Sequence, residues 1–170
     1  MDNQSNHTRK QELVMSRIFS VPRGKVWKAW TDPESAKEWW GPVNFTAPFI
    51  HIDLRVGGKY VNCMRSPDGT DYWSTGFYKE ITPPSRLVLT DSFADENGNI
   101  VGADYYGMDP GFPRESLVTV TLEEIDGKTG FTMKYDDVSQ MKDEDLQGMK
   151  QGWNESFDKL ADYLSRQEQS

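Results

Sequence analysis

Residues 143–164 constrain the fold more than any other stretch, because they have the periodicity of one long amphipathic helix. At about 100° per residue, a set of large apolar side chains falls within an arc of roughly 80°. The set comprises Leu146, Met149, Trp153, Phe157, Leu160 and Leu164. Acidic residues at 143–145 lie near the positive end of the helix dipole, and Arg166 follows the last turn. Since such a helix gains its stability mainly from packing, the rest of the chain must cover this apolar face.

Two glycines, Gly148 and Gly152, lie four residues apart inside this helix. Each costs about 1 kcal/mol relative to alanine in a helix interior. One interpretation is a core helix that tolerates both glycines. The other is that a second backbone or a bound molecule approaches the helix there, which would make the helix one wall of a cavity.

The length of 170 residues fits one domain. We expect a flexible tail at residues 1–10, a single domain at 11–166 and a second tail at 167–170. No apolar run approaches the ~20 residues that span a bilayer, and residues 1–10 lack the apolar core of a signal peptide. The lone Cys63 cannot form an internal disulfide. Together these features predict a cytoplasmic protein with no membrane insertion.

The charge and the aromatic content narrow the class of partner. A net charge of -8 and a pI near 4.8 argue against nucleic acid, because phosphate backbones are bound by clustered Lys and Arg. The chain also contains 6 Trp, 7 Tyr and 8 Phe, which is generous for its length. We expect some of these aromatic side chains to lie in the core and others to line a pocket.

The rest of the chain has the alternating apolar pattern of an antiparallel sheet. A first strand at residues 11–20 precedes two short helices at 23–30 and 34–40, the second opened by Asp32 as a cap and by Pro33. Further strands follow at residues 46–53, 59–65, 72–81, 86–93, 115–124 and 131–137. Tight turns at residues 66–69 and 126–127 join consecutive strands. These signals predict an α+β fold in which a strongly curved antiparallel sheet wraps round the C-terminal helix.

Short motifs between Leu13 and Leu164 carry a family resemblance. They are residues 21–34 (VPRGKVWKAWTDPE), 39–42 (WWGP), 57–58 (GG), 67–69 (PDG), Gly76 with 80–81 (EI), 84–87 (PSRL), and Gly152, Trp153 and Leu160 with 163–164 (YL). The sequence thereby resembles the heat-shock protein 90 ATPase activator homologue family of the START-like (SRPBCC) superfamily. This resemblance implies the helix-grip fold known from birch-pollen-allergen-like proteins. In that fold a seven-stranded antiparallel sheet curves round a long C-terminal helix, two short helices lie between the first two strands, and a cavity lies between sheet and helix.

No motif for catalysis, metal binding or cofactor binding stands out in the sequence. His7 and His51 have no partners at ligand spacing, so we predict no metal site. A nucleophile elbow, a Walker loop and a dinucleotide fingerprint are all missing, so we predict no cofactor and assign no catalytic residue. Cys63 is better explained as a buried, inert thiol than as a nucleophile.

An apolar cavity with a few polar groups is the usual form of a small-molecule site. Asp91 alternates with Leu87, Leu89 and Phe93, so it shares their apolar face, and either the cavity or solvent lies on that face. The candidate ligand-binding residues, taken from the resemblance and the helix stripe, are Trp30, Trp40, Tyr60, Met64, Tyr78, Asp91, Met133, Trp153 and Phe157. Ordinary core packing is the alternative for each, because the sequence leaves open which strand parity faces inward.

The loop at residues 94–114 is long enough to suggest a function of its own. Its apolar side chains, Tyr105, Tyr106, Met108 and Phe112, suit either a lid over the cavity or an interface with a homodimer partner. We favour the lid.

Three classes of function fit these features. The first is non-catalytic binding or transport of a small hydrophobic molecule, which we expect. The second, which the resemblance implies, is an interaction module that stimulates a heat-shock chaperone ATPase. The third is a cyclase-type or hydrolase-type enzyme that uses a cavity Tyr and Asp as acid and base.

Overall fold

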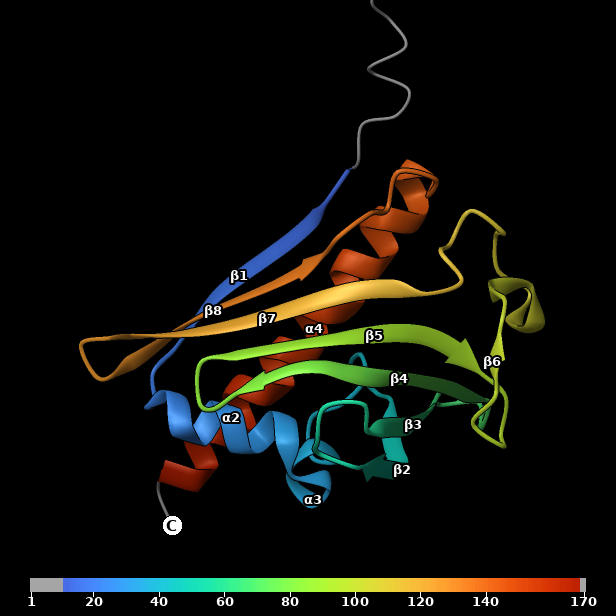
Figure 1. Ribbon diagram of the computed structural model, residues 1–170. Coiled ribbons are helices and arrows are strands. Elements are labelled where there is room, and N and C mark those ends of the chain that lie inside the picture. Colours follow the sequence, from blue (N-terminus) through green and yellow to red (C-terminus); the bar gives the residue numbers. More distant parts are fainter. Residues whose placement is uncertain (1–10, 169–170) are drawn as a thin grey trace, which may run out of the picture.

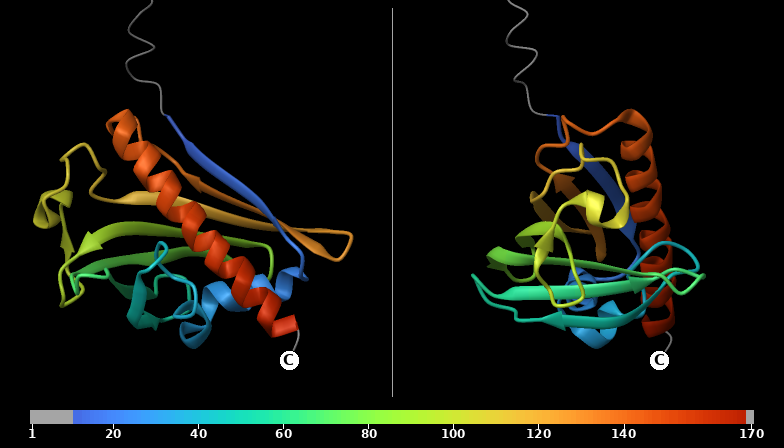
Figure 2. Two further views of the ribbon diagram at one scale, coloured as in Figure 1. Left: turned by 180° about the vertical axis from the view of Figure 1, so that it is seen from behind. Right: turned by 90° about the vertical axis from the view of Figure 1, so that its right-hand side faces the viewer.

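The computed structural model describes residues 11–168, and it has the predicted α+β architecture. A curved antiparallel sheet holds the long helix α4 (Asp143–Glu168) across its concave face (Figures 1 and 2). The strand order is β1-β8-β7-β5-β4-β3-β2, with the two-residue strand β6 paired to the end of β5. The helix-grip arrangement implied by the family resemblance is therefore confirmed.

The element bounds agree with the periodicity along most of the chain. The strands are β1 (Leu13–Phe19), β2 (Thr46–Ile52), β3 (Lys59–Arg65), β4 (Asp71–Thr82), β5 (Arg86–Ala94), β6 (Ile100–Val101), β7 (Ser116–Ile125) and β8 (Lys128–Tyr135). The shorter helices are α2 (Arg23–Thr31), α3 (Pro33–Ala36) and the 3-10 helix η1 (Ala103–Tyr106). Within residues 11–168 no helix is long and apolar enough to cross a membrane.

Several boundaries differ from the sequence predictions, among them the start of β8, which lies at Lys128 and not at residue 131. The helix expected at residues 34–40 ends at Ala36, because the N–H groups of Glu38 and Trp39 bond three residues back, the latter to the carbonyl of Ala36 (3.2 Å). The loop expected at 94–114 contains β6 and η1, and α4 continues to Glu168. The expected tail at residues 1–10 and the last two residues of the chain lie outside the described part.

The start of α3 follows the predicted capping chemistry. The Asp32 carboxylate accepts hydrogen bonds from the backbone N–H of Ser35 (3.0 Å) and from its hydroxyl (2.8 Å). Pro33 occupies the first helical position, where its missing N–H costs nothing. This cap fixes the direction in which the chain leaves α2 and returns toward the sheet.

The strand parities that face inward are now defined. On β8, Phe131, Met133 and Tyr135 are buried, whereas on the edge strand β1 the side chains of Val14 and Ile18 point outward and are 47% and 57% exposed. Tyr60 on β3 and Tyr78 on β4 face the core and are each 4% exposed. The inward side chains meet the apolar face of α4 in one continuous core.

The apolar face of α4 has two different environments along its length. Phe157, Leu160 and Leu164 are at most 2% exposed and complete a solid core against the sheet. Met149 and Trp153, nearer the N-terminal end, are only half-buried. The C-terminal half of α4 therefore holds the fold together, while its N-terminal half leaves space between helix and sheet.

Candidate functional site

A cavity of about 600 Å³ lies between the N-terminal half of α4 and the concave face of the sheet. Its wall also includes the turn at residues 40–42, the end of the β3–β4 hairpin and the segment at 107–113. The volume falls within the range of roughly 300–1,000 Å³ usual for small-molecule sites. The large apolar and aromatic side chains of the lining are Trp40, Met64, Tyr72, Trp73, Phe93, Met108, Phe112, Tyr135, Met141, Met149 and Trp153.

A chain of hydrogen bonds forms the polar part of this wall. The indole N–H of Trp153 donates to the Tyr135 hydroxyl (3.2 Å), which in turn donates to Oδ2 of Asp91 (2.8 Å). The Tyr60 hydroxyl donates to the carbonyl oxygen of Thr90 (2.7 Å) and lies 3.4 Å from Oδ1 of Asp91. Asp91 is thus the acceptor on which helix α4 and strands β3 and β8 converge.

Burial sets the protonation of this network. Removal from water raises the pKa of Asp91, while the hydrogen bonds from Tyr135 and Tyr60 partly offset that rise. Burial, followed by the charge of Asp91, raises the pKa of both tyrosines well above the usual phenol value. Both hydroxyls therefore keep their protons at neutral pH and act as donors.

Trp40 and Trp153, which line the cavity, belong to a cluster of four indole rings with Trp30 and Trp39. Trp30 stacks on Trp153 with ring centroids 6.2 Å apart, and Trp40 meets Trp153 edge to face at 5.4 Å. Trp39 is fully buried, packs against Trp30 at 5.0 Å and donates from its indole N–H to the carbonyl of Ala29 (3.0 Å). This packing positions Trp40 and Trp153 at the cavity wall.

Lys159 fixes the turn that carries Trp40, Gly41 and Pro42. Its ammonium lies 3.1–3.4 Å from the carbonyl oxygens of these residues and of Phe45. Partial burial lowers the pKa of Lys159, and the four carbonyl groups supply the acceptors that the ammonium needs. The sequence analysis did not identify this contact, which ties α4 to the rim of the cavity.

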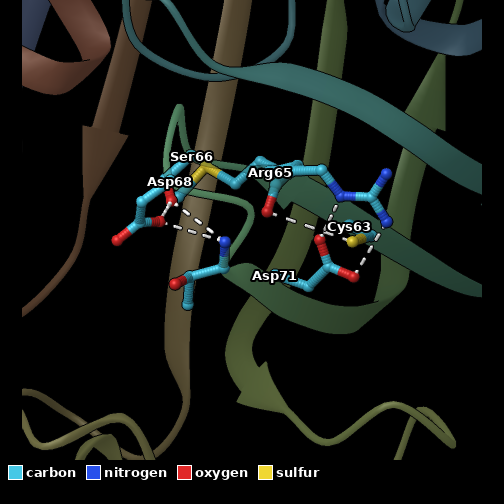
Figure 3. Close-up of polar contacts among 7 residues, drawn as sticks. Cys63, Arg65, Ser66, Asp68 and Asp71 are labelled. Atoms are coloured by element: carbon cyan, nitrogen blue, oxygen red, sulfur yellow. Dashed lines mark hydrogen bonds and ion pairs between the residues drawn. The ribbon is translucent and has the colours of Figure 1, made fainter.

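The β3–β4 hairpin forms the outer wall, and a set of exposed polar contacts holds it (Figure 3). The Arg65 guanidinium binds both oxygens of Asp71, from Nε at 2.7 Å and from Nη2 at 3.1 Å. In the turn between them, the backbone N–H of Thr70 donates to Ser66 and to Asp68. The next pair in the ladder is Met64 opposite Tyr72, and both line the cavity.

The two glycines of α4 border the cavity. A Cβ atom built at Gly148 would meet no atom within 4 Å, and one at Gly152 would meet only Cγ of Pro42, at 3.7 Å. Within residues 11–168 no second backbone comes close to either glycine, so the structure does not support the interpretation that another backbone packs against α4 there. Both residues instead line the cavity, so their missing side chains leave it open.

The predicted ligand-binding residues fall into three places. Trp40, Met64, Asp91 and Trp153 line the cavity of about 600 Å³. Trp30, Tyr60 and Tyr78 line a separate void of about 20 Å³, which is too small for an organic ligand. Met133 and Phe157 are 2% and 0% exposed and belong to the packed core. The assignment of ligand binding to any of them stays a prediction.

Tyr135 and Phe93 line the cavity but were not among the candidate ligand-binding residues, whereas Phe112, which also lines it, was predicted as part of a lid. Tyr135 shares the parity of Met133 on β8, so the same inward face would have identified it. The Phe93 and Phe112 rings lie 5.9 Å apart, which brings the 107–113 segment onto the end of β5. Ser92, also in the lining, has a buried hydroxyl without a hydrogen-bond partner among the described residues.

The other candidate chemical groups lie away from this cavity. His51 is exposed on β2. Cys63 is 1% exposed, and burial raises the pKa of its thiol to about 11, so thiolate is scarce at neutral pH. Among residues 11–168 no three His, Cys, Asp or Glu side chains gather in a way that would hold a metal ion.

A bent antiparallel sheet that holds a long C-terminal helix, with a cavity between them, defines a protein of the START-like, helix-grip class. Residues 20–165 match the family described as Activator of Hsp90 ATPase homolog 1-like protein. Because the match spans most of the sequence, the chain belongs to this family. Among curated proteins, no sequence matches.

Solved structures give the same result for the fold. The chain is similar to a protein from Arthrobacter aurescens (29% identity, TM-score 0.77, 91% of this chain and 86% of that chain). It is also similar to a protein from Mycobacterium smegmatis (26% identity, TM-score 0.70, 89% and 86%). The AHSA1 protein from Silicibacter pomeroyi shares the fold at 24% identity (TM-score 0.73, 92% and 99%).

Proposed function

We propose that the protein binds and carries a small hydrophobic molecule in the cavity between α4 and the sheet, without converting it chemically. The observation that carries this proposal is the cavity of about 600 Å³, which the apolar side chains of helix and sheet line but do not fill. Protein interiors are normally packed to the density of organic crystals, so an unfilled apolar space of this size points to a ligand.

The sequence of α4 supports this reading. Gly148 and Gly152 each cost about 1 kcal/mol of helix stability relative to alanine. Neither glycine is needed for close packing, because a Cβ atom would meet nothing at Gly148 and only Pro42 at Gly152. Their benefit is the space that they leave, which a carrier needs and a solid core does not.

The polar groups favour binding over catalysis. Tyr60 and Tyr135 hold their protons at neutral pH and donate them within the protein, to Thr90 and Asp91. Neither hydroxyl therefore serves as a base, so an acid and base mechanism would have to use Asp91, which already accepts a hydrogen bond from Tyr135. The Cys63 thiol is protonated and does not line the cavity.

Titration with N-phenyl-1-naphthylamine, a neutral apolar dye that fluoresces when it leaves water, tests the proposal. We expect saturable binding at one site per chain. Gly152→Leu places a large side chain in the cavity wall and should weaken binding by about tenfold or more, which is about 1.4 kcal/mol. The matched control is Gln147→Leu, which adds the same residue on the exposed side of α4 and should bind as the natural protein does.

Equal binding by the natural protein and Gly152→Leu would place the dye elsewhere and remove the support for a carrier. Native mass spectrometry of the protein purified without denaturants gives a second readout. A small molecule that copurifies with the natural chain, and is lost from Gly152→Leu, would be expected.

The family name suggests a second candidate function, stimulation of a heat-shock chaperone ATPase. The match over residues 20–165 is the observation that favours it. The discriminating measurement is the rate of ATP hydrolysis by the chaperone with and without this protein. A rate increase that Gly152→Leu retains would favour an interaction module over a carrier.

A further inference from the structure

The charged residues that line the cavity all have the same sign. Asp91, Asp109, Glu144 and Asp145 are among them, and none of the lining residues is Lys, Arg or His. Three of these carboxylates have compensation. Asp109 forms an ion pair with Lys142 at 2.7 Å, while Glu144 and Asp145 lie in the first turn of α4, near the positive end of its dipole.

Asp91 has no such compensation. It lies on the central strand β5, and among the described residues no Lys, Arg or His lies within ion-pair distance of it. Its side-chain partners are the neutral hydroxyls of Tyr135 and Tyr60, at 2.8 and 3.4 Å. A carboxylate that is largely withdrawn from water and has no cation beside it is costly unless a ligand supplies one.

The direction of the hydrogen bonds defines what the ligand must offer. Trp153 donates to Tyr135 and Tyr135 donates to Asp91, so the chain of donors ends on an acceptor. A carboxylate offers about four acceptor positions, and the two hydroxyls occupy at most two of them. The complementary ligand group is therefore a donor, and a positively charged donor forms the strongest such hydrogen bond.

The aromatic lining of the cavity also favours a positively charged ligand group. Rings of Trp40, Tyr72, Phe93, Phe112 and Trp153 line the cavity. The faces of such rings attract cations, most strongly those of tryptophan, by about 0.5–2 kcal/mol for each well-placed contact. The same rings provide apolar surface for the uncharged part of a ligand.

We propose that the ligand is a hydrophobic amine whose protonated nitrogen donates to Asp91 and whose apolar body lies among the aromatic rings. This inference rests on the proposed function and specifies its ligand class. The net charge of -8 attracts a cation toward the protein as a whole. A fatty acid or another anion would instead place its negative charge in a cavity whose charged lining residues are all carboxylates.

The pKa of Asp91 gives independent support. Burial raises this pKa when no ligand is bound, and a neighbouring ammonium group would lower it again. An amine therefore favours the ionised form of Asp91 as it binds, whereas an alcohol of the same shape supplies no charge to do so.

Three probes with one naphthyl body test the proposal by isothermal titration calorimetry on the full chain at about neutral pH. They are 2-(1-naphthyl)ethylamine, 2-(1-naphthyl)ethanol and 1-naphthylacetate, which are cationic, neutral and anionic. We expect the amine to bind about tenfold more tightly than the alcohol, and the acetate to bind most weakly.

Two variants test whether Asp91 is responsible for the preference for the amine over the alcohol. Asp91→Asn should reduce the preference for the amine over the alcohol to within about threefold, with the fold verified by circular dichroism. Asp143→Asn is the matched control, because it removes one negative charge from the exposed start of α4, outside the cavity lining. It should leave the preference within about threefold of the natural value, since exposed charges at a distance are screened.

The outcomes separate the two proposals. Equal affinity for amine and alcohol in the natural protein, or an equal loss of preference in Asp91→Asn and Asp143→Asn, would overturn the amine assignment and leave the carrier function in place. Failure of all three probes to bind would overturn the carrier function, and the amine assignment with it.

Discussion

The same substitution, glycine to alanine, should have opposite effects on stability at two positions. The contrast tests whether the space beside α4 is an open cavity and the contact between β4 and β5 is closely packed. Gly148 lies inside α4 beside the cavity, and a Cβ atom there would meet nothing within 4 Å. Gly148→Ala should therefore stabilise the protein by about 0.5–1 kcal/mol, the difference in helix propensity. In a domain of this size that corresponds to a rise of roughly 1–4 °C in Tm.

Gly76 on β4 has the opposite surroundings. A Cβ atom there would lie 1.9 Å from the carbonyl oxygen of Thr90 and 2.7 Å from Cε2 of Tyr60. Since the nearer atom belongs to the backbone of β5, the two strands would have to separate. We expect Gly76→Ala to cost about 3 kcal/mol or more, which lowers Tm by roughly 6–12 °C.

Urea unfolding followed by tryptophan fluorescence, with linear extrapolation, measures both changes. Gly24→Ala in α2 is the control for Gly76→Ala, because a Cβ atom at position 24, unlike one at position 76, meets no atom of the described residues within 4 Å. If Gly148→Ala destabilised the protein by more than about 1 kcal/mol, some part of the chain would have to pack against α4 at this point. The cavity would then be smaller than described, and the argument for a carrier would lose its basis.

Three further perturbations follow from the contacts in the site and core. Lys159→Met should lower the free energy of unfolding by about 1–2 kcal/mol, a figure that allows for the partial exposure of this side chain. It should also increase amide hydrogen exchange at residues 40–45, because four carbonyl groups lose their shared donor. Unchanged exchange would mean that the ammonium does not hold the turn. Phe157→Ala should lower the free energy of unfolding, measured in urea, by about 3–5 kcal/mol, since the ring is 0% exposed and packs on Phe131 at 4.9 Å. A loss under about 1 kcal/mol would contradict tight packing between the C-terminal half of α4 and the sheet. For Asp91, burial raises the folded-state pKa above the usual 3.8, so the folded protein binds the proton more tightly, and stability falls as pH rises from the unfolded-state pKa through the raised folded-state pKa. The stability of Asp91→Asn relative to the natural protein should therefore increase from about pH 4 to about pH 7, and a flat or opposite trend in urea midpoints would contradict the burial of this charge.

The local features of the sequence predicted most of the fold. The 100° periodicity of α4, the Asp32 cap and the turn at residues 66–69 depend on neighbours within a few positions, and all three formed as expected. Helix α3 was predicted too long, because the tertiary contact of the Trp39 indole with Ala29 helps to decide the path of the chain after Ala36.

The composition of the site could be predicted only in part. Periodicity shows which face of α4 is apolar but not where along its axis the core ends and the cavity begins, so Phe157 was placed in the site together with Trp153. The decisive contacts join distant residues: Tyr135 reaches Asp91 across 44 positions, and Lys159 reaches Trp40 across 119. Such pairs follow from strand order and helix placement, which no short stretch of sequence encodes.

Methionine methyl NMR measures the central claim most directly, because the methionines within residues 11–168 divide between cavity and core. Met64, Met108, Met141 and Met149 line the cavity, whereas Met15 and Met133 are buried in the packed core at 3% and 2% exposure. On titration with N-phenyl-1-naphthylamine, the cavity methyl groups should shift and show nuclear Overhauser contacts to the dye, while the two core methyl groups should show none. Contacts from the dye to none of the four cavity methionines at saturation would contradict the claim that this space is a ligand site.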